Sequence, residues 1–293
     1  MNKIFEGSAV ALVTPFTQSG INISALKKLI DFQIEGGTDA IVVCGTTGEP
    51  ATMTEQERDM TVRESVKHIA GRVPVIVGTG SNNTAHAVEL SKRAQDMGAD
   101  ALLVVTPYYN KCSQEGLKRH FFAVADSVDI PIVMYNVPSR TGVNVKPETL
   151  GQIAKHKNIA AMKEASGDIS QVAEMSRIAG EDIALYSGND DQIVPLMSLG
   201  GNGVISVLAN IAPRAAHDIC AAYLSGDVKR ACELQLYYNP LISALFMDVN
   251  PIPVKMALNM MGFEAGPLRL PLCDMDAAKT EKLRGVLKEY KLI

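Results

Sequence analysis

Lys163 is the residue whose type and position most directly suggest covalent chemistry. It follows the apolar residues 159–162. In a strand, where side chains alternate between the two faces, Lys163 would share a face with Ala161, and Met162 would share the other with Glu164. Burial favours the neutral amine, which can attack a ketone. The pattern favours a Schiff-base lysine, although a lysine that follows a strand can also extend to water.

Two further polar residues follow a neighbouring apolar run. Tyr135 ends the run and could pass a proton to or from a carbinolamine hydroxyl. Such a tyrosine can equally be a packed aromatic side chain with a solvated hydroxyl group. Arg140 lies in the loop beyond it, where its guanidinium could bind a carboxylate with two hydrogen bonds or simply be solvated.

The sequence GTTG at 45–48 follows another apolar run. Its backbone N–H groups are closely spaced in a turn bracketed by glycines, which suits a carboxylate. The hydroxyl groups of Thr46 and Thr47 could relay protons. Turns of this kind are common, and we expect a structural role for Glu49, which follows.

Short β-branched runs alternate along the chain with segments of helical period, as in parallel strands joined by crossover helices. Because most of the runs are continuously apolar, both faces of the sheet should be covered. We therefore predict an α/β fold, a (β/α)8 TIM barrel, with its active site at the carboxyl ends of the strands. The expected strands are 8–13, 40–44, 73–77, 101–105, 130–135, 159–163, 183–186 and 203–207.

Helices are expected between these strands, with caps at Ser24, Thr54 and Asp168, and Glu57 completes a capping box with Thr54. After about residue 224 the pattern shows no strand. It predicts helices at 227–246, 253–261 and 276–290, separated by proline- and glycine-rich segments. We therefore expect a catalytic barrel over 1–224 and a C-terminal helical region over 225–293.

Composition argues against several classes of function. The chain has 293 residues, a formal net charge of −4 and 47% hydrophobic residues. It has no cluster of lysine and arginine residues that would bind nucleic acid or an anionic membrane. The amino terminus does not read as a signal peptide, and no apolar run approaches the about 20 residues that a membrane helix needs. Widely spaced cysteines argue against disulfides and fit a reduced, cytoplasmic setting: Cys44, Cys112, Cys220, Cys232 and Cys273.

Metal and nucleotide cofactors are not expected. The five histidines fall in helical segments without paired ligand spacing, so surface or capping roles are expected. Gly78 and Gly80 follow a strand but lack the third glycine of a dinucleotide-binding motif.

Five motifs along the whole chain resemble the 4-hydroxy-tetrahydrodipicolinate synthase family, formerly called dihydrodipicolinate synthase. They stand in the family's order and at its approximate spacing. The motifs are GTTGE at 45–49, TPYYN at 106–110, YNVPSRTG at 135–142, KEASGD at 163–168 and SGNDD at 187–191.

The resemblance implies a cofactor-free lyase in which pyruvate condenses with Lys163 and the resulting enamine attacks L-aspartate-4-semialdehyde, in lysine and diaminopimelate biosynthesis. It also implies a homotetramer, built as a dimer of dimers. Tyr135, Thr46 and Tyr109 would form a proton relay, with Tyr109 entering across a tight dimer interface. Thr47 would hold the pyruvate carboxylate, Arg140 would bind that of the semialdehyde, and backbone groups of Gly188 and Ile205 would shape the pocket.

Two alternatives and one regulatory expectation accompany this interpretation. The sialic acid (N-acetylneuraminate) lyase branch shares the lysine and the tyrosine, but it lacks the arginine that stands at Arg140. A non-catalytic barrel that only binds keto or amino acids is the other alternative. Many family members are inhibited by lysine, and this chain keeps the matching Asn82 and Tyr108. At other positions of that pocket the chain departs from lysine-sensitive members, so we predict weak or absent lysine feedback; these are Pro50, Glu55, Arg58 and His86.

Overall fold

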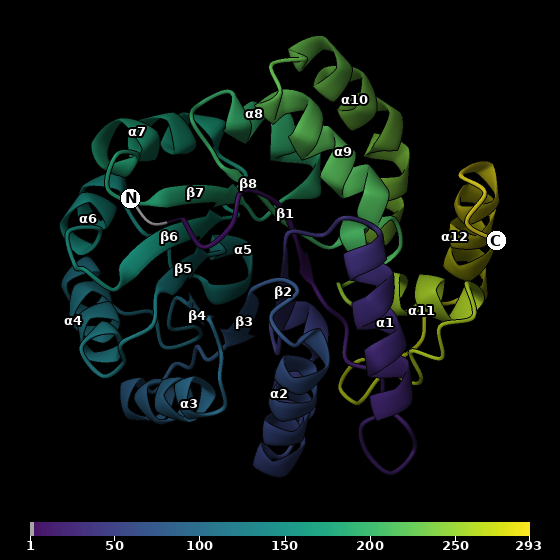
Figure 1. Cartoon of the computed structure of the whole chain (residues 1–293), viewed down its shortest axis with the longest axis horizontal. Coiled ribbons are helices and arrows are strands. Elements are labelled where there is room, and N and C mark those ends of the chain that lie inside the picture. Colours follow the sequence, from purple (N-terminus) through teal and green to yellow (C-terminus); the bar gives the residue numbers. More distant parts are fainter. Residues whose placement is uncertain (1–2) are drawn as a thin grey trace.

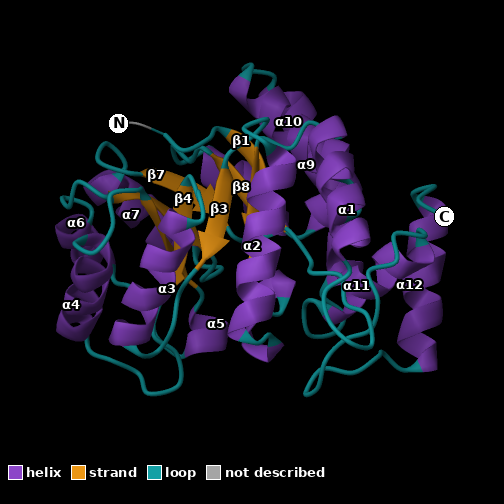
Figure 2. Ribbon diagram, turned by 60° about the horizontal axis from the view of Figure 1, so that its bottom comes forward, coloured by secondary structure: helices purple, strands orange, loops and turns teal. Residues whose placement is uncertain are grey.

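The computed structural model describes residues 3–293, and its centre is a closed barrel of eight parallel strands in chain order, β1 to β8. Figure 1 shows the strands surrounded by helices, and Figure 2 shows the same barrel from a second direction. The strands are β1 Gly7–Ala11, β2 Ala40–Val43, β3 Val75–Gly78, β4 Ala101–Val105, β5 Ile132–Asn136, β6 Ile159–Glu164, β7 Ala184–Ser187 and β8 Gly203–Ser206.

The barrel predicted from the alternating pattern is confirmed, and each expected strand overlaps an observed one. The ends differ by at most two residues: β1 ends at Ala11, for example, although Leu12 and Val13 continue the apolar run. These two residues are buried in the core outside the strand. An apolar run indicates which residues are buried, whereas the end of a strand depends on its hydrogen bonds. The expected and observed ends therefore differ slightly.

The two faces of the strands belong to different cores. Ala161 lies in the cluster inside the barrel, whereas Met162 packs in the larger cluster between barrel and helices. The predicted alternation along this strand is therefore confirmed. Inside the barrel, Phe5 stacks on Tyr186 with ring centroids 4.1 Å apart.

The helices surround the barrel, and their caps follow local sequence with one exception. Thr54 and Glu57 form the predicted capping box, and Asp168 caps the next predicted helix through Gln171 N–H. The prediction for Ser24 is wrong, because the Asn22 side chain accepts from Ala25 N–H. The helices are α1 Ile23–Glu35, α2 Glu55–Ile69, α3 Thr84–Asp96, α4 Gln114–Ala125, α5 Pro138–Thr141, α6 Pro147–Ile153, α7 Ile169–Ala179, α8 Ile193–Met197 and α9 Pro213–Leu224.

Three more helices follow the barrel, as predicted: α10 Val228–Leu245, α11 Ile252–Met260 and α12 Ala277–Glu289. α10 packs on α9 and α12, and α11 packs on α12 and on the short turn after β8. Figure 1 shows α11 and α12 at the edge of the molecule, beyond α1. The division into a barrel and a C-terminal region stays a prediction. None of the helices within residues 3–293 is long and apolar enough to cross a membrane.

Candidate active site

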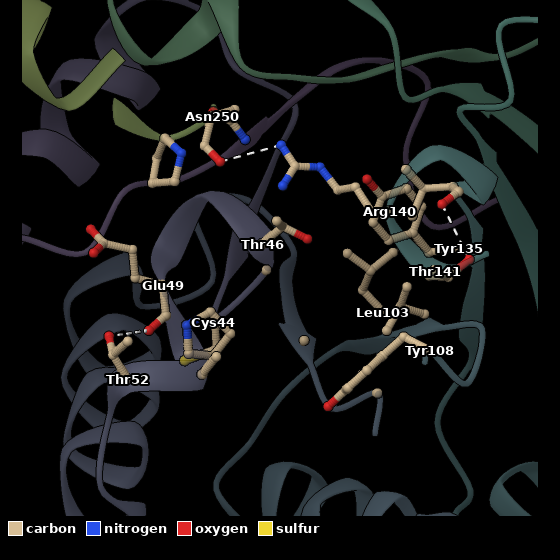
Figure 3. A pocket seen from close by; sticks show the side chains of 18 of the residues that line it. Cys44, Thr46, Glu49, Thr52, Leu103, Tyr108, Tyr135, Arg140, Thr141 and Asn250 are labelled. Atoms are coloured by element: carbon tan, nitrogen blue, oxygen red, sulfur yellow. Dashed lines mark hydrogen bonds between the residues drawn. The ribbon is translucent and has the colours of Figure 1, made fainter. Parts of the chain in front are cut away.

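A cavity of about 220 Å³ is lined by residues that follow several different strands. It adjoins a larger, mainly apolar pocket of about 380 Å³, shown in Figure 3. Both lie at the carboxyl ends of the strands, where a parallel barrel carries its chemistry. Six of the residues singled out in the sequence line the smaller cavity: Thr46, Thr47, Tyr135, Arg140, Lys163 and Gly188.

Lys163 is held in β6 between two tyrosines on the adjoining strands. It stands in register with Tyr135 of β5 and Tyr186 of β7, and it is only 5% exposed. Burial lowers the pKa of Lys163 to about 8, with Arg140 acting in the same direction and the charge of Asp190 opposing them. Roughly a tenth of the amine is therefore neutral at pH 7, far more than for an ordinary lysine, and the alternative of a lysine that reaches water does not hold.

Tyr135 lies directly beside the amine. Lys163 Nζ is 4.5 Å from the centroid of the Tyr135 ring. Burial raises the pKa of the Tyr135 phenol, although the charge of Arg140 and the nearby hydroxyl group of Thr46 partly oppose the rise. The phenol is consequently protonated at neutral pH and is equipped to donate a proton.

The GTTG turn lines the cavity. The short helix η1 Thr46–Gly48 is closed by hydrogen bonds from Gly48 N–H to Gly45 O, at 2.9 Å, and from Glu49 N–H to Thr46 O, at 3.1 Å. Within residues 3–293, no backbone acceptor is found for the N–H groups of Thr46 and Thr47. Two adjacent donors at the start of a helical turn suit a carboxylate.

Asn250 is a lining residue that the sequence interpretation missed. Its Nδ2 donates to Thr47 Oγ1 at 3.1 Å, and its backbone carbonyl accepts from Arg140 Nη2 at 3.2 Å. Figure 3 shows this contact with the Arg140 guanidinium. Because Thr47 Oγ1 accepts this bond, its own proton remains available to a ligand. The NPIP segment that carries Asn250 gave no sign of this role, since only the fold brings it to the barrel.

Asp190, in the SGNDD motif, was also assigned no role from the sequence. Its Oδ2 accepts from the N–H groups of Val207 and Leu208, and its Oδ1 is buried without a hydrogen-bond partner among the described residues. Burial raises the pKa of Asp190, and the charge of Lys163 acts against that rise. A carboxylate behind the cavity wall can therefore stabilise positive charge on the Lys163 nitrogen.

Two residues named in the sequence lie outside the cavity. The Tyr109 side chain is 87% exposed, and its backbone has a φ of 71°, with its N–H 3.3 Å from Thr141 O. Ile205 is fully buried in β8, on the inner face of the barrel. Neither side chain reaches the cavity within its own chain.

A metal or redox centre would need clustered ligands or paired cysteines. Among residues 3–293 there is no cluster of three or more histidine, cysteine or acidic residues that could hold a metal ion. The five cysteines are unpaired. The expected surface or capping role is wrong for His120, which is buried in α4 with Nδ1 3.0 Å from Thr84 Oγ1. Burial lowers its pKa to about 4, so it is neutral.

A closed parallel barrel with a buried, partly neutral lysine in a polar cavity at its carboxyl end defines a barrel enzyme that works through a Schiff base. Residues 4–290 match the model of the dihydrodipicolinate synthetase family, and the chain belongs to this family. It is 57% identical over 291 residues to a 4-hydroxy-tetrahydrodipicolinate synthase of Thermoanaerobacter, an alignment that covers 99% of this chain and 98% of that one.

Two other relatives agree. A 4-hydroxy-tetrahydrodipicolinate synthase of Clostridium perfringens is 54% identical over 290 residues, covering 99% of this chain and all of that one. A crystal structure of dihydrodipicolinate synthase from Thermotoga maritima superposes with a TM-score of 0.97 at 44% identity, covering 99% of this chain and 100% of that chain. Fold and sequence therefore assign the same family.

Proposed function

We propose that this chain condenses pyruvate with L-aspartate-4-semialdehyde through a Schiff base on Lys163, giving 4-hydroxy-tetrahydrodipicolinate for lysine and diaminopimelate biosynthesis. The observation that carries the proposal is the buried Lys163 amine, whose pKa is lowered to about 8 in a cavity beside Tyr135. Within residues 3–293 no carboxylate forms an ion pair with it, in contrast to the buried Lys255. A free amine can therefore attack the ketone carbon of pyruvate.

The reaction proceeds in steps that each need a proton transfer, and cavity residues can donate or accept these protons. The Lys163 nitrogen adds to the ketone carbon, and the carbinolamine loses its hydroxyl group as water after a proton arrives from Tyr135. The iminium then loses a methyl proton to the Tyr135 phenolate to give an enamine, whose carbon attacks the aldehyde of the second substrate while Tyr135 returns the proton to the new alkoxide. Thr46, which lines the same cavity and whose hydroxyl group lowers the pKa of Tyr135, would relay protons to that phenol. The amino group of the bound semialdehyde would close the ring and release Lys163.

Each carboxylate has a proposed partner. The N–H groups of the turn and the free hydroxyl proton of Thr47 would hold pyruvate, and Arg140 would bind the semialdehyde. Gly188 supplies space: an added Cβ would lie 2.7 Å from Ala165 Cβ and 3.0 Å from Lys163 Cε. Ile205 would shape the pocket through its backbone.

Tyr109 requires a second copy of the chain in this proposal. Its ring projects 87% exposed from a loop that is anchored to Thr141, which suits a residue that enters the relay of a neighbouring site. A homotetramer built as a dimer of dimers, working in the cytoplasm, follows the family resemblance. Sedimentation velocity at assay concentration tests the assembly, and a fully active monomer would contradict the role of Tyr109.

Weak or absent lysine feedback is part of the proposal. Arg58 Nη2 donates to Gly78 O at 2.9 Å and lines the larger pocket, where its charge opposes an effector ammonium. Glu55 is already paired with Arg93 at 2.9 Å. Turnover measured against increasing lysine tests this, and inhibition at submillimolar lysine would contradict it.

Borohydride trapping tests the covalent step. With pyruvate present, reduction should attach a three-carbon group to Lys163, and peptide mapping should find none on Lys255, a buried lysine that is ion-paired. Folded protein that gains no adduct would refute the mechanism. Turnover of aspartate semialdehyde compared with N-acetylneuraminate then separates a synthase from a sugar-acid lyase.

A further inference from the structure

Four charged side chains join the C-terminal region to the turn at residues 45–49 and to α2. Lys255 Nζ lies 2.7 Å from Glu49 Oε1, and both side chains are 1% exposed. The Arg269 guanidinium binds both oxygens of Glu57, and its backbone N–H lies 3.4 Å from Glu49 Oε2. Two cations and two carboxylates therefore neutralise one another between distant parts of the chain.

The ring of Phe16 supports both cations of this group. Lys255 Nζ and Arg269 Cζ each lie 4.0 Å from its centroid. Ring faces attract cations most strongly where water is excluded, and Phe16 is 1% exposed. The tip of the Lys255 side chain is consequently held from two directions, by a carboxylate and by a ring.

Glu49 connects this charged group with the catalytic turn. Its backbone has φ 54° and ψ 41°, in the left-handed region that residues other than glycine seldom adopt. Its N–H donates to Thr46 O, and its carbonyl accepts from Thr52 N–H and Oγ1, each at 3.2 Å; Figure 3 shows the contact with Thr52. A shift of the Glu49 side chain would therefore move the backbone that closes the turn over Thr46 and Thr47.

Stability alone gives little reason for a charged pair at this place. Replacing a buried ion pair by apolar side chains of similar volume is often neutral or favourable for folding. What an ion pair adds is a hydrogen bond of fixed direction and length between two elements. In this chain those elements are α11 and the turn that ends at Glu49.

We propose that the Lys255–Glu49 ion pair is a positioning device for the pyruvate-binding turn, and that the C-terminal region is thereby a working part of the active site. The proposal rests on the proposed function, because it assigns Thr46 and Thr47 to pyruvate. Neither Glu49 nor Lys255 touches a reacting atom. The bond from Asn250 to Thr47 is a second tether from the same region.

The double variant Glu49→Gln/Lys255→Met tests this role, because it removes both charges and leaves neither ion buried alone. We expect a melting temperature close to that of the wild type but a KM for pyruvate raised roughly 10- to 100-fold, the scale of small misplacements in an active site. The KM for the semialdehyde should change little, since Arg140 lies outside the turn. Arg284→Met is the control: Arg284 pairs with Glu281 within α12, and its loss should leave both KM values unchanged.

A wild-type pyruvate KM in the folded double variant would overturn the positioning role. If that variant does not fold, Glu49→Asp serves instead: it keeps the charge but shortens the side chain, and it should raise the pyruvate KM by about tenfold. An unchanged KM there would equally overturn the proposal. Borohydride labelling at saturating pyruvate keeps the two proposals apart. Failure to label wild-type Lys163 refutes the proposed function, whereas labelling of the variant with an unchanged KM refutes only the positioning role.

Discussion

Two buried lysines of this protein have similar pKa values but different surroundings. Burial lowers the pKa of both Lys163 and Lys255 to about 8. Lys255 is bound to Glu49 at 2.7 Å and lies over an aromatic ring. Within residues 3–293 Lys163 has no such ion pair, and it faces a cavity. The two lysines thus share a lowered pKa, but only the Lys163 amine is open to a substrate.

The comparison separates two consequences of burying an amine. Around Lys255 a carboxylate compensates the charge of the buried amine, and it accepts a hydrogen bond from the nitrogen. The carboxylate that acts on the pKa of Lys163 is Asp190, whose Oδ2 accepts from two backbone N–H groups. The nitrogen of Lys163 therefore keeps a direction open for a carbonyl carbon, and this is the property that covalent chemistry needs.

The strongest test of the contrast is Lys163→Arg, which keeps a positive charge but removes the nucleophile. We expect turnover to fall by at least roughly 1,000-fold, because no covalent intermediate can form and only binding and the remaining proton-transfer groups still contribute, and we expect the borohydride adduct to disappear. Steady-state kinetics and intact mass measure both effects. An unchanged turnover would contradict any covalent role for Lys163.

Lys255→Met should have its main effect on stability instead. It leaves Glu49 buried without its partner, so we expect the free energy of unfolding to fall by about 3 kcal/mol. Lys163→Met should not lower it, because an amine that is costly to bury is replaced by an apolar side chain of similar length. Urea denaturation of the two variants gives the comparison. Equal losses in both would contradict the distinction drawn between the lysines.

Adduct formation should follow the charge of Lys163. Only the neutral amine attacks, so the rate should rise about tenfold per pH unit below the pKa of about 8 and level off above it. Borohydride trapping at low pyruvate over a series of pH values measures the profile. A midpoint near the ordinary lysine pKa would show that the amine is solvated.

Asp190→Asn should shift the midpoint of that pH profile, with a smaller effect on the rate. The Asp190 charge raises the pKa of Lys163, so its removal should move the midpoint below about 8. Near neutral pH, trapping should become a few-fold faster, while the cationic iminium loses a stabilising anion and turnover declines. Asp191→Asn is the control, because Asp191 is exposed in the same loop. A common midpoint in both variants would contradict the electrostatic role.

Local sequence predicted much of the fold. Alternation of apolar runs with helical segments predicted the barrel because both signals are periodic over several residues. The capping box at Thr54 was predictable because its hydrogen bonds join residues three apart. The cap at Ser24 was wrong, because Asn22, two residues earlier, makes the same kind of bond. Lys163, Tyr135 and the GTTG turn were visible because each follows an apolar run.

Only the tertiary structure decided what surrounds these residues. Asn250 reaches Thr47 across 203 positions of the chain, and Lys255 reaches Glu49 across 206. No periodicity or local motif connects residues so far apart, since their contact depends on how the C-terminal helices pack on the barrel. Sequence alone thus determined which chemical groups stand at the strand ends. Folding decided which buried lysine has a partner and which is free, because desolvation and ion pairing depend on neighbours in space.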